Sequence, residues 1–150
     1  MKKIILIINT IFFLSAQVNA DDLKSQILTM KDRAELRDRF IKDRMKTVLP
    51  KIMDRTEIDM WIIIAREYNE DPVLRTMLPA TWLNARRRTI LVIYNPGGNM
   101  PLETFAIARY DVGKIFKKAW DPEDNPDQYG ALAELINAKN PTKIALNQSR

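Results

Sequence analysis

Two apolar runs separated by a polar segment constrain the fold of this chain more than any other feature. The runs cover residues 58–65 and 89–94, and both are rich in large aliphatic and aromatic side chains. These residue types favour β-strands, and a run that is apolar at nearly every position is typical of a strand covered on both faces. We therefore expect two internal strands, joined by the polar, proline-containing segment 66–88.

Periodic apolar residues predict a long helix before the first strand. Between residues 31 and 55, apolar side chains recur every three or four positions and define one helix face, with charged residues on the other. Pro50 lies inside this pattern and is expected to kink the helix or divide it in two, because proline lacks a backbone N–H. The predicted apolar face consists of Leu36, Phe40, Val48, Leu49, Ile52 and Met53.

The second half of the chain predicts three further strands and a helix. Residues 95–101 combine prolines and glycines and predict a hairpin turn. Strands are expected at residues 102–110, 112–120 and 143–147. A helix is expected at residues 126–138, with Tyr129, Leu132, Leu135 and Ile136 on one face. This order of elements predicts an α/β domain with a mixed sheet flanked by helices.

The first 20 residues have the three parts of a secretory signal peptide. Lys2 and Lys3 form a charged start, an apolar run follows, and small residues end the segment at Ala20. The alternative is a membrane anchor, but the run is shorter than the roughly 20 apolar residues that span a bilayer. We expect cleavage after Ala20, which leaves a mature domain at 21–150 that is exported and either periplasmic or secreted, without a membrane association.

The chain contains no cysteine and no histidine, and this excludes several functional classes. Disulfides, thiolate nucleophiles, Ser-His-Asp triads and histidine-containing metal centres cannot be built from these residues alone. Two of the 24 basic residues lie in the predicted signal peptide, which leaves 22 basic against 19 acidic residues. Because this excess is small and the two signs are interleaved, nucleic acid is not an expected partner.

The polar segment between the two expected strands contains the candidate site residues. Polar connections beside buried strands are common places for binding residues in α/β domains. Asn69 and Asp71 ahead of Pro72 predict a turn, with Asp71 as the N-cap of a short helix through Met77. The candidates for a pocket wall or interface are Arg66, Glu67, Tyr68, Asn69, Asp71, Arg86 and Arg87, and none is expected to be catalytic or to ligate a metal.

Three consecutive arginines precede the second expected strand. Side chains alternate along a strand, so Arg86 and Arg88 would share one side while Arg87 would take the other. This geometry is poor for a single anion site. We expect instead that these arginines form ion pairs with Glu67, Glu70 or Asp71.

A long motif resembles one family. The run IDMWIIIAREYNEDPVL, followed by MLPATWLNARRRTILV and later by NPTKIALNQS, resembles the amino-terminal domain of secreted Xaa-Pro aminopeptidase-like proteins. These belong to the creatinase, prolidase and aminopeptidase P group of pita-bread metallopeptidases, and the resemblance covers residues 36–149. It implies a three-layer α/β/α domain ahead of a catalytic domain. That second domain binds two divalent metals, often manganese, through aspartates, glutamates and a histidine.

The resemblance also implies a role and a limit. In this family the amino-terminal domain supports oligomerisation and helps to form the wall of the substrate pocket. The present chain ends where the catalytic domain would follow and contains no histidine. We therefore expect a domain truncated at its carboxyl end, without enzyme activity or a cofactor of its own. The expected partners are its own catalytic domain or a second copy, and a peptide.

Two alternatives remain open. The chain could be a stand-alone periplasmic module that binds a peptide or small anion through residues 66–88. It could also be a small enzyme that uses only carboxylates, with Glu67, Glu70 and Asp71 as the candidates. For these three residues a solvated turn is the expectation.

Overall fold

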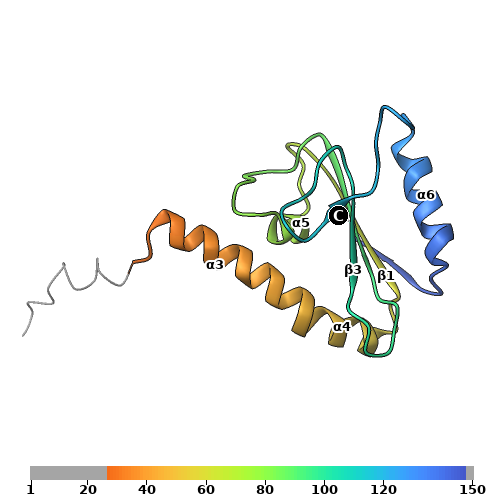
Figure 1. Ribbon diagram of the computed structural model, residues 1–150, viewed down its shortest axis with the longest axis horizontal. Helices are drawn as coiled ribbons and strands as arrows, with labels where there is room; N and C mark the ends of the chain where they lie inside the picture. The colour runs from red at the N-terminus through yellow and green to blue at the C-terminus, as the bar shows by residue number, and fades with distance from the viewer. Residues whose placement is uncertain (1–26, 148–150) are drawn as a thin grey trace, which may run out of the picture. The chain divides into compact units, whose positions relative to one another are not determined.

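A computed structural model describes residues 27–147 and shows an α/β fold with a five-stranded mixed sheet (Figure 1). The chain divides into two compact units, Met1–Arg33 and Ala34–Arg150, and the sheet lies in the second. The predicted signal peptide and its cleavage site at Ala20 lie outside the described residues. In the first unit, the Thr29 hydroxyl accepts a hydrogen bond from the Asp32 amide at 3.1 Å, at the start of helix α3 (Met30–Asp43).

The two apolar runs form the predicted internal strands. Strand β1 (Met60–Arg66) pairs antiparallel with β2 (Arg88–Tyr94), from Met60 opposite Tyr94 to Arg66 opposite Arg88. The five central residues of β2 are all buried. The strand order is β4-β3-β2-β1-β5, so both strands have neighbours on each side. Their near-continuous apolar sequence reflects burial on both faces, as expected.

The other three strands complete a mixed sheet. Strand β3 (Glu103–Ile107) pairs antiparallel with β2, which confirms the predicted hairpin at residues 95–101. Strand β5 (Ile144–Leu146) is an edge strand parallel to β1. At the opposite edge, β4 (Lys117–Lys118) runs parallel to β3.

The predicted strand at residues 112–120 is much shorter than expected. Val112 and Phe116 bond to each other across a tight turn that contains Gly113, whose φ is +66°. A Cβ at this glycine would lie 3.0 Å from the Pro79 side chain, so the turn also packs closely. The left-handed backbone of the turn is incompatible with a continuous strand. Only Lys117 and Lys118 therefore join the sheet.

Pro50 divides the long helix, which is one of the two outcomes predicted from the sequence. Helix α3 is followed by a π-helical turn (Arg44–Val48) and then by α4 (Leu49–Thr56), with Pro50 in the first turn of α4. Proline has no backbone N–H to donate at this position, and the last amide before it, that of Leu49, donates to the Arg44 carbonyl in the π-turn. The wider π-turn immediately before it accommodates the interruption.

The buried face of this helical segment differs from the prediction. Phe40, Val48 and Ile52 are exposed, whereas Leu49 and Met53 are buried as expected. Six apolar positions at mixed spacings of three and four span too wide an arc to face one surface. The face that packs on the sheet follows a strict spacing of four: Ile41, Met45, Leu49 and Met53.

Two hydrophobic clusters lie on the two faces of the sheet. One joins the α3–α4 segment and α5 (Pro72–Met77) to alternate strand residues such as Ile63 and Leu91. The other joins α6 (Gln128–Lys139) to the intervening residues, including Ile62 and Val92. Figure 1 shows α6 on one side of the strands and α4 and α5 on the other. The alternation of side chains along each strand supplies both clusters.

Helix α6 forms close to its predicted bounds. Leu132 is buried, and Leu135 and Ile136 pack against the same cluster. Asn140 ends the helix in the left-handed conformation, with φ +46°. Tyr129 was predicted to share this apolar face, but it is 49% exposed and does not join the cluster. No helix within residues 27–147 is long and apolar enough to cross a membrane.

Candidate functional site

The polar segment 66–71 and the arginines before β2 meet at one end of the sheet. Arg66 and Arg88 are register partners at the end of the β1–β2 ladder. Beyond them the Glu67 amide donates a hydrogen bond to the Arg87 carbonyl at 2.6 Å. The chain then reverses, with the Asn69 amide donating to the Arg66 carbonyl at 3.0 Å. The antiparallel register therefore brings together two candidate groups that are about 20 residues apart in sequence.

Left-handed backbone conformations shape this end of the sheet. Tyr68 has φ +67° and Arg87 has φ +52°, and both are uncommon for residues other than glycine. Tyr68 is 88% exposed at the tip of its turn. At Arg87 this conformation interrupts the extended chain immediately before β2 begins at Arg88. Backbone strain of this kind is often found at functional sites.

The predicted alternation of Arg86, Arg87 and Arg88 is wrong. All three line one cavity of about 620 Å³. The alternation rule applies to an extended strand, whereas the positive φ of Arg87 turns the backbone between its two neighbours. The Thr89 hydroxyl donates to the Arg86 carbonyl at 3.2 Å and stabilises this turn. All three arginines therefore line the same cavity, although the sequence pattern argued against a common site.

The predicted ion pairs with Glu67, Glu70 and Asp71 are absent from residues 27–147, where the ion pairs involve lysines. These carboxylates accept hydrogen bonds from backbone N–H groups instead. Glu67 binds the Arg87 amide at 3.3 Å, and Glu70 binds the Tyr68 amide at 3.3 Å. Asp71 caps α5 as predicted. Turns expose unpaired backbone donors close to each carboxylate, and these local donors replace the more distant guanidinium groups.

The main cavity at this end of the sheet is strongly basic. It is lined by residues of the β1–β2 end, the end of β3 and the start of α6. Its charged members comprise four arginines and a single carboxylate, that of Glu67. A shallower cavity of about 430 Å³ adjoins it and adds Arg66 and Tyr68. Arg66, Glu67, Tyr68, Arg86 and Arg87 are thus brought together, while Asn69 and Asp71 line neither cavity.

Aromatic rings support two of the arginines. The Arg86 guanidinium lies 4.5 Å from the centre of the Trp82 ring and 5.9 Å from that of Tyr110. The Arg88 guanidinium lies 4.6 Å from the centre of the Tyr129 ring. Such stacking restricts the side chain and leaves the edge N–H groups of the guanidinium available for other partners.

Sequence reasoning missed the residues that the fold contributes from elsewhere. Trp82 precedes the arginines, but nothing in the local pattern separates it from a core residue. The other members come from the end of β3 and the start of α6, which only the sheet topology places at this end. The missed lining residues include Trp82, Asn84, Arg109, Tyr110, Trp120 and Gln128.

Nearby acidic groups are already engaged. Lys118 binds the Asp121 carboxylate, and this contact is the main reason that the pKa of Asp121 lies below its ordinary value, with a smaller contribution from Arg109. Lys117 and the Lys118 amide lower the pKa of Asp111 in the same way. Both carboxylates are therefore ionised at neutral pH and bonded to the β4 lysines.

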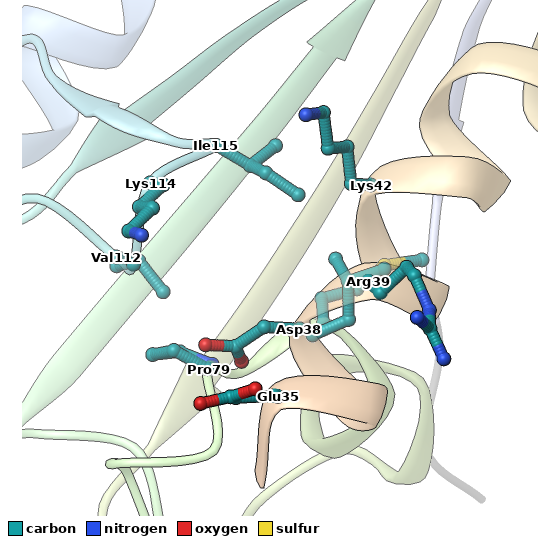
Figure 2. A pocket seen from close by; sticks show the side chains of 11 residues that line it. Glu35, Asp38, Arg39, Lys42, Pro79, Val112, Lys114 and Ile115 are labelled. Atoms are coloured by element: carbon teal, nitrogen blue, oxygen red, sulfur yellow. The ribbon is translucent and has the colours of Figure 1, made fainter. Parts of the chain in front are cut away.

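A second cavity lies beside helix α3 and differs in character. It has a volume of about 320 Å³ and is formed with the Pro79 turn and the turn at residues 112–115. Figure 2 shows the Glu35 and Asp38 carboxylates directed toward Pro79, with Val112 on the opposite wall. Asp38 accepts a hydrogen bond from the Ala80 amide at 2.8 Å. Charges of both signs and a largely apolar floor make this a less selective site than the arginine-lined cavity.

Known proteins offer no further assignment. Comparison with protein-family models, curated proteins and solved structures gave no match to this chain. Within residues 27–147, no group of three or more acidic, histidine or cysteine side chains is placed to hold a metal ion. The four guanidinium groups of the cavity are suited to bind an anion.

Proposed function

We propose that this chain is a non-catalytic domain of an exported Xaa-Pro aminopeptidase-like metallopeptidase, which associates with protein and helps to form a peptide-binding pocket. The observation that carries this proposal is the convergence of residues 66–68 and 86–88 on one cavity edge. These segments lie within the two motif runs that resemble the family, REYNEDPVL and LNARRRTILV.

The arrangement of layers supports the finer assignment of a creatinase-type amino-terminal domain. Helices pack on both faces of the mixed sheet, which is the three-layer α/β/α arrangement that the resemblance implies. Edge strand β5 presents Ile144 and Leu146, which are 40% and 65% exposed. Phe40 and Val48 are likewise exposed on a helix face. An open sheet edge and exposed apolar side chains are suited to association with another protein surface.

The residues that are present indicate which functions this chain and its catalytic partner would each supply. Histidine and cysteine are absent from the sequence, and the carboxylates nearest the cavity are bonded to backbone N–H groups. In this proposal the metal-bound nucleophile belongs to the catalytic partner. The present chain contributes basic and aromatic side chains that orient the peptide.

Immunoprecipitation from the source cells tests this proposal. An antibody raised against the chain would be used on periplasmic or secreted material, and the precipitate would be assayed for manganese-dependent release of the first residue of Xaa-Pro peptides. We expect activity in the precipitate and none in the purified full chain supplied with manganese. A precipitate without this activity would contradict the proposal, as would hydrolysis by the purified chain alone.

The basic cavity also favours a second candidate, a stand-alone periplasmic module for a peptide or small anion. This alternative predicts a native product no larger than the 17.5 kDa chain and no associated peptidase activity. An immunoblot of the same extract under denaturing conditions distinguishes the candidates. A much larger band that carries the same epitope favours the metallopeptidase domain.

A further inference from the structure

We infer that the cavity lined by Arg86, Arg87, Arg88 and Arg109 binds the carboxyl-terminal carboxylate of a short peptide. The choice of a peptide rests on the proposed function, whereas the choice of a carboxylate rests on the charges and geometry of the cavity. We call this cavity the arginine cavity. The capping and turn contacts of the nearby carboxylates do not use the guanidinium groups of this cavity.

The positive charge of the arginine cavity is only partly neutralised by nearby acidic groups, which are Glu67 in its lining and Asp121, whose pKa Arg109 helps to lower. Four guanidinium groups line it, and within residues 27–147 none of them lies within 4 Å of a carboxylate oxygen. The lining carboxylate, Glu67, accepts a hydrogen bond from the Arg87 amide. Four like charges around one cavity repel one another, and a bound anion relieves that repulsion.

Two of these guanidinium groups are held before any ligand arrives. Trp82 and Tyr110 flank Arg86, and Tyr129 lies against Arg88. Trp82 is itself buried, with 8% of its surface exposed, so it provides a fixed base for Arg86. A side chain that is already restricted loses less conformational entropy on binding. This pre-organisation is suited to a planar carboxylate, which a guanidinium binds through two parallel hydrogen bonds.

The dimensions and remaining walls point to a short peptide. A volume of about 620 Å³ lies within the range of small-ligand sites. Trp120 and Tyr110 provide apolar surface beside the arginines, suited to the side chains of a peptide. Glu67 adds one negative group, which would attract a peptide's amino terminus and repel a second carboxylate. The arrangement therefore favours a zwitterion over a polyanion.

Calorimetric titration of the full chain, purified after export, tests this inference. The probes are the tripeptide Ala-Pro-Ala with a carboxylate terminus and the same tripeptide with a terminal amide. We expect the amide to bind at least about tenfold more weakly, because charge-assisted hydrogen bonds to the guanidinium groups are lost. Equal affinities for the two peptides, or binding of neither, would overturn the inference.

Matched variants locate the binding site. Arg86→Gln removes a guanidinium from the arginine cavity, and Arg39→Gln removes one from the cavity beside α3. Both change the net charge equally. We expect Arg86→Gln to weaken binding of the acid peptide about tenfold and Arg39→Gln to leave it unchanged. Equal losses in both variants would show a general charge effect and contradict the assignment. Circular dichroism of each variant identifies any loss of folding, and Arg88→Gln replaces Arg86→Gln if the latter does not fold.

Competition with inorganic phosphate distinguishes a peptide carboxylate from a phosphate group as the anion that the cavity binds. We expect millimolar phosphate to compete weakly with the acid peptide, because both contact the same guanidinium groups. Tight binding of phosphate without measurable peptide binding would assign the cavity to a phosphate-bearing ligand and overturn the peptide inference. This result would leave the association with a metallopeptidase untouched, because the immunoprecipitation assay measures that association independently.

Discussion

At the scale of single residues, the candidate site depends on backbone conformation more than on side-chain type. Arg87 adopts a left-handed conformation that places it in one cavity with Arg86 and Arg88. Tyr68 adopts a similar conformation on the facing turn. Residues with a Cβ adopt it only where surrounding contacts offset the steric cost. Here the Glu67 carboxylate and the Glu67 amide bond to the backbone of Arg87 and supply such contacts.

Asp71 provides a prediction at this scale. Its carboxylate accepts hydrogen bonds from the Val73 and Leu74 amides and also from the Asn147 side chain, at 2.9 Å. We expect Asp71→Ala to lower the free energy of unfolding by about 1–2 kcal/mol, because the cap of α5 is lost. Urea denaturation measures this change.

Asp71→Asn is the matched control, because asparagine retains a side-chain oxygen that can accept from the same amides. We expect it to remain within about 0.5 kcal/mol of the original chain. An alanine variant as stable as the asparagine variant would show that the cap contributes little.

At the scale of elements, the helical segment before β1 shows how a π-turn selects the buried face. The widened turn Arg44–Val48 shifts the phase of the helix just before α4 begins. Ile41 before this turn, Met45 within it, and Leu49 and Met53 after it all belong to the same cluster. Phe40 and Val48 remain exposed in consequence.

A pair of truncations tests this assignment of faces. Leu49 is 5% exposed and Ile52 is 38% exposed. We expect Leu49→Ala to reduce the free energy of unfolding by about 2–4 kcal/mol, because it removes buried methyl groups and leaves a cavity. Ile52→Ala should cost less than about 1 kcal/mol, because part of that side chain is already solvated and alanine favours the helix. Chemical denaturation of both variants gives the comparison. A larger loss at Ile52 than at Leu49 would contradict the buried face assigned by the structure.

At the scale of the whole molecule, a single side chain joins three elements at the arginine cavity. Gln128, the first residue of α6, donates hydrogen bonds through Nε2 to the carbonyl of Arg88 at 3.2 Å and of Ile107 at 2.6 Å. It therefore links the start of β2 and the end of β3 to the helix. Gln128 is buried, and its hydrogen bond to the Ile107 carbonyl is buried, whereas the one to the Arg88 carbonyl is partly buried.

Removal of this link should affect both stability and the cavity. We expect Gln128→Ala to lower the free energy of unfolding by about 1–3 kcal/mol, because two carbonyls lose a buried donor. Glu134→Ala, an exposed change on the same helix, should stay within about 0.5 kcal/mol. Thermal and urea unfolding provide the measurements. Comparable stabilities for the two variants would contradict the linking role of Gln128.

The sequence determined the types and order of most elements. The apolar runs predicted β1 and β2, the glycine-containing segment predicted the hairpin to β3, and Asp71 predicted the cap of α5. The signals for these features are local, because an apolar run, glycines in a turn and a carboxylate just before a helix are all patterns of neighbouring residues in the chain. The arginines and acidic residues of the candidate site could also be identified from the sequence, because they lie in two short segments of the chain.

Tertiary structure decided how those residues are combined. The positive φ of Arg87 is set by contacts with Glu67 across the sheet, and periodicity cannot reveal it. Arg109 and Gln128 reach the cavity because β3 ends and α6 begins beside the start of β2. The turn at Gly113, packed against Pro79, shortened β4 by a contact between distant segments. Sequence patterns report local preferences, whereas the arginine cavity is created by pairing and packing between residues far apart in the chain.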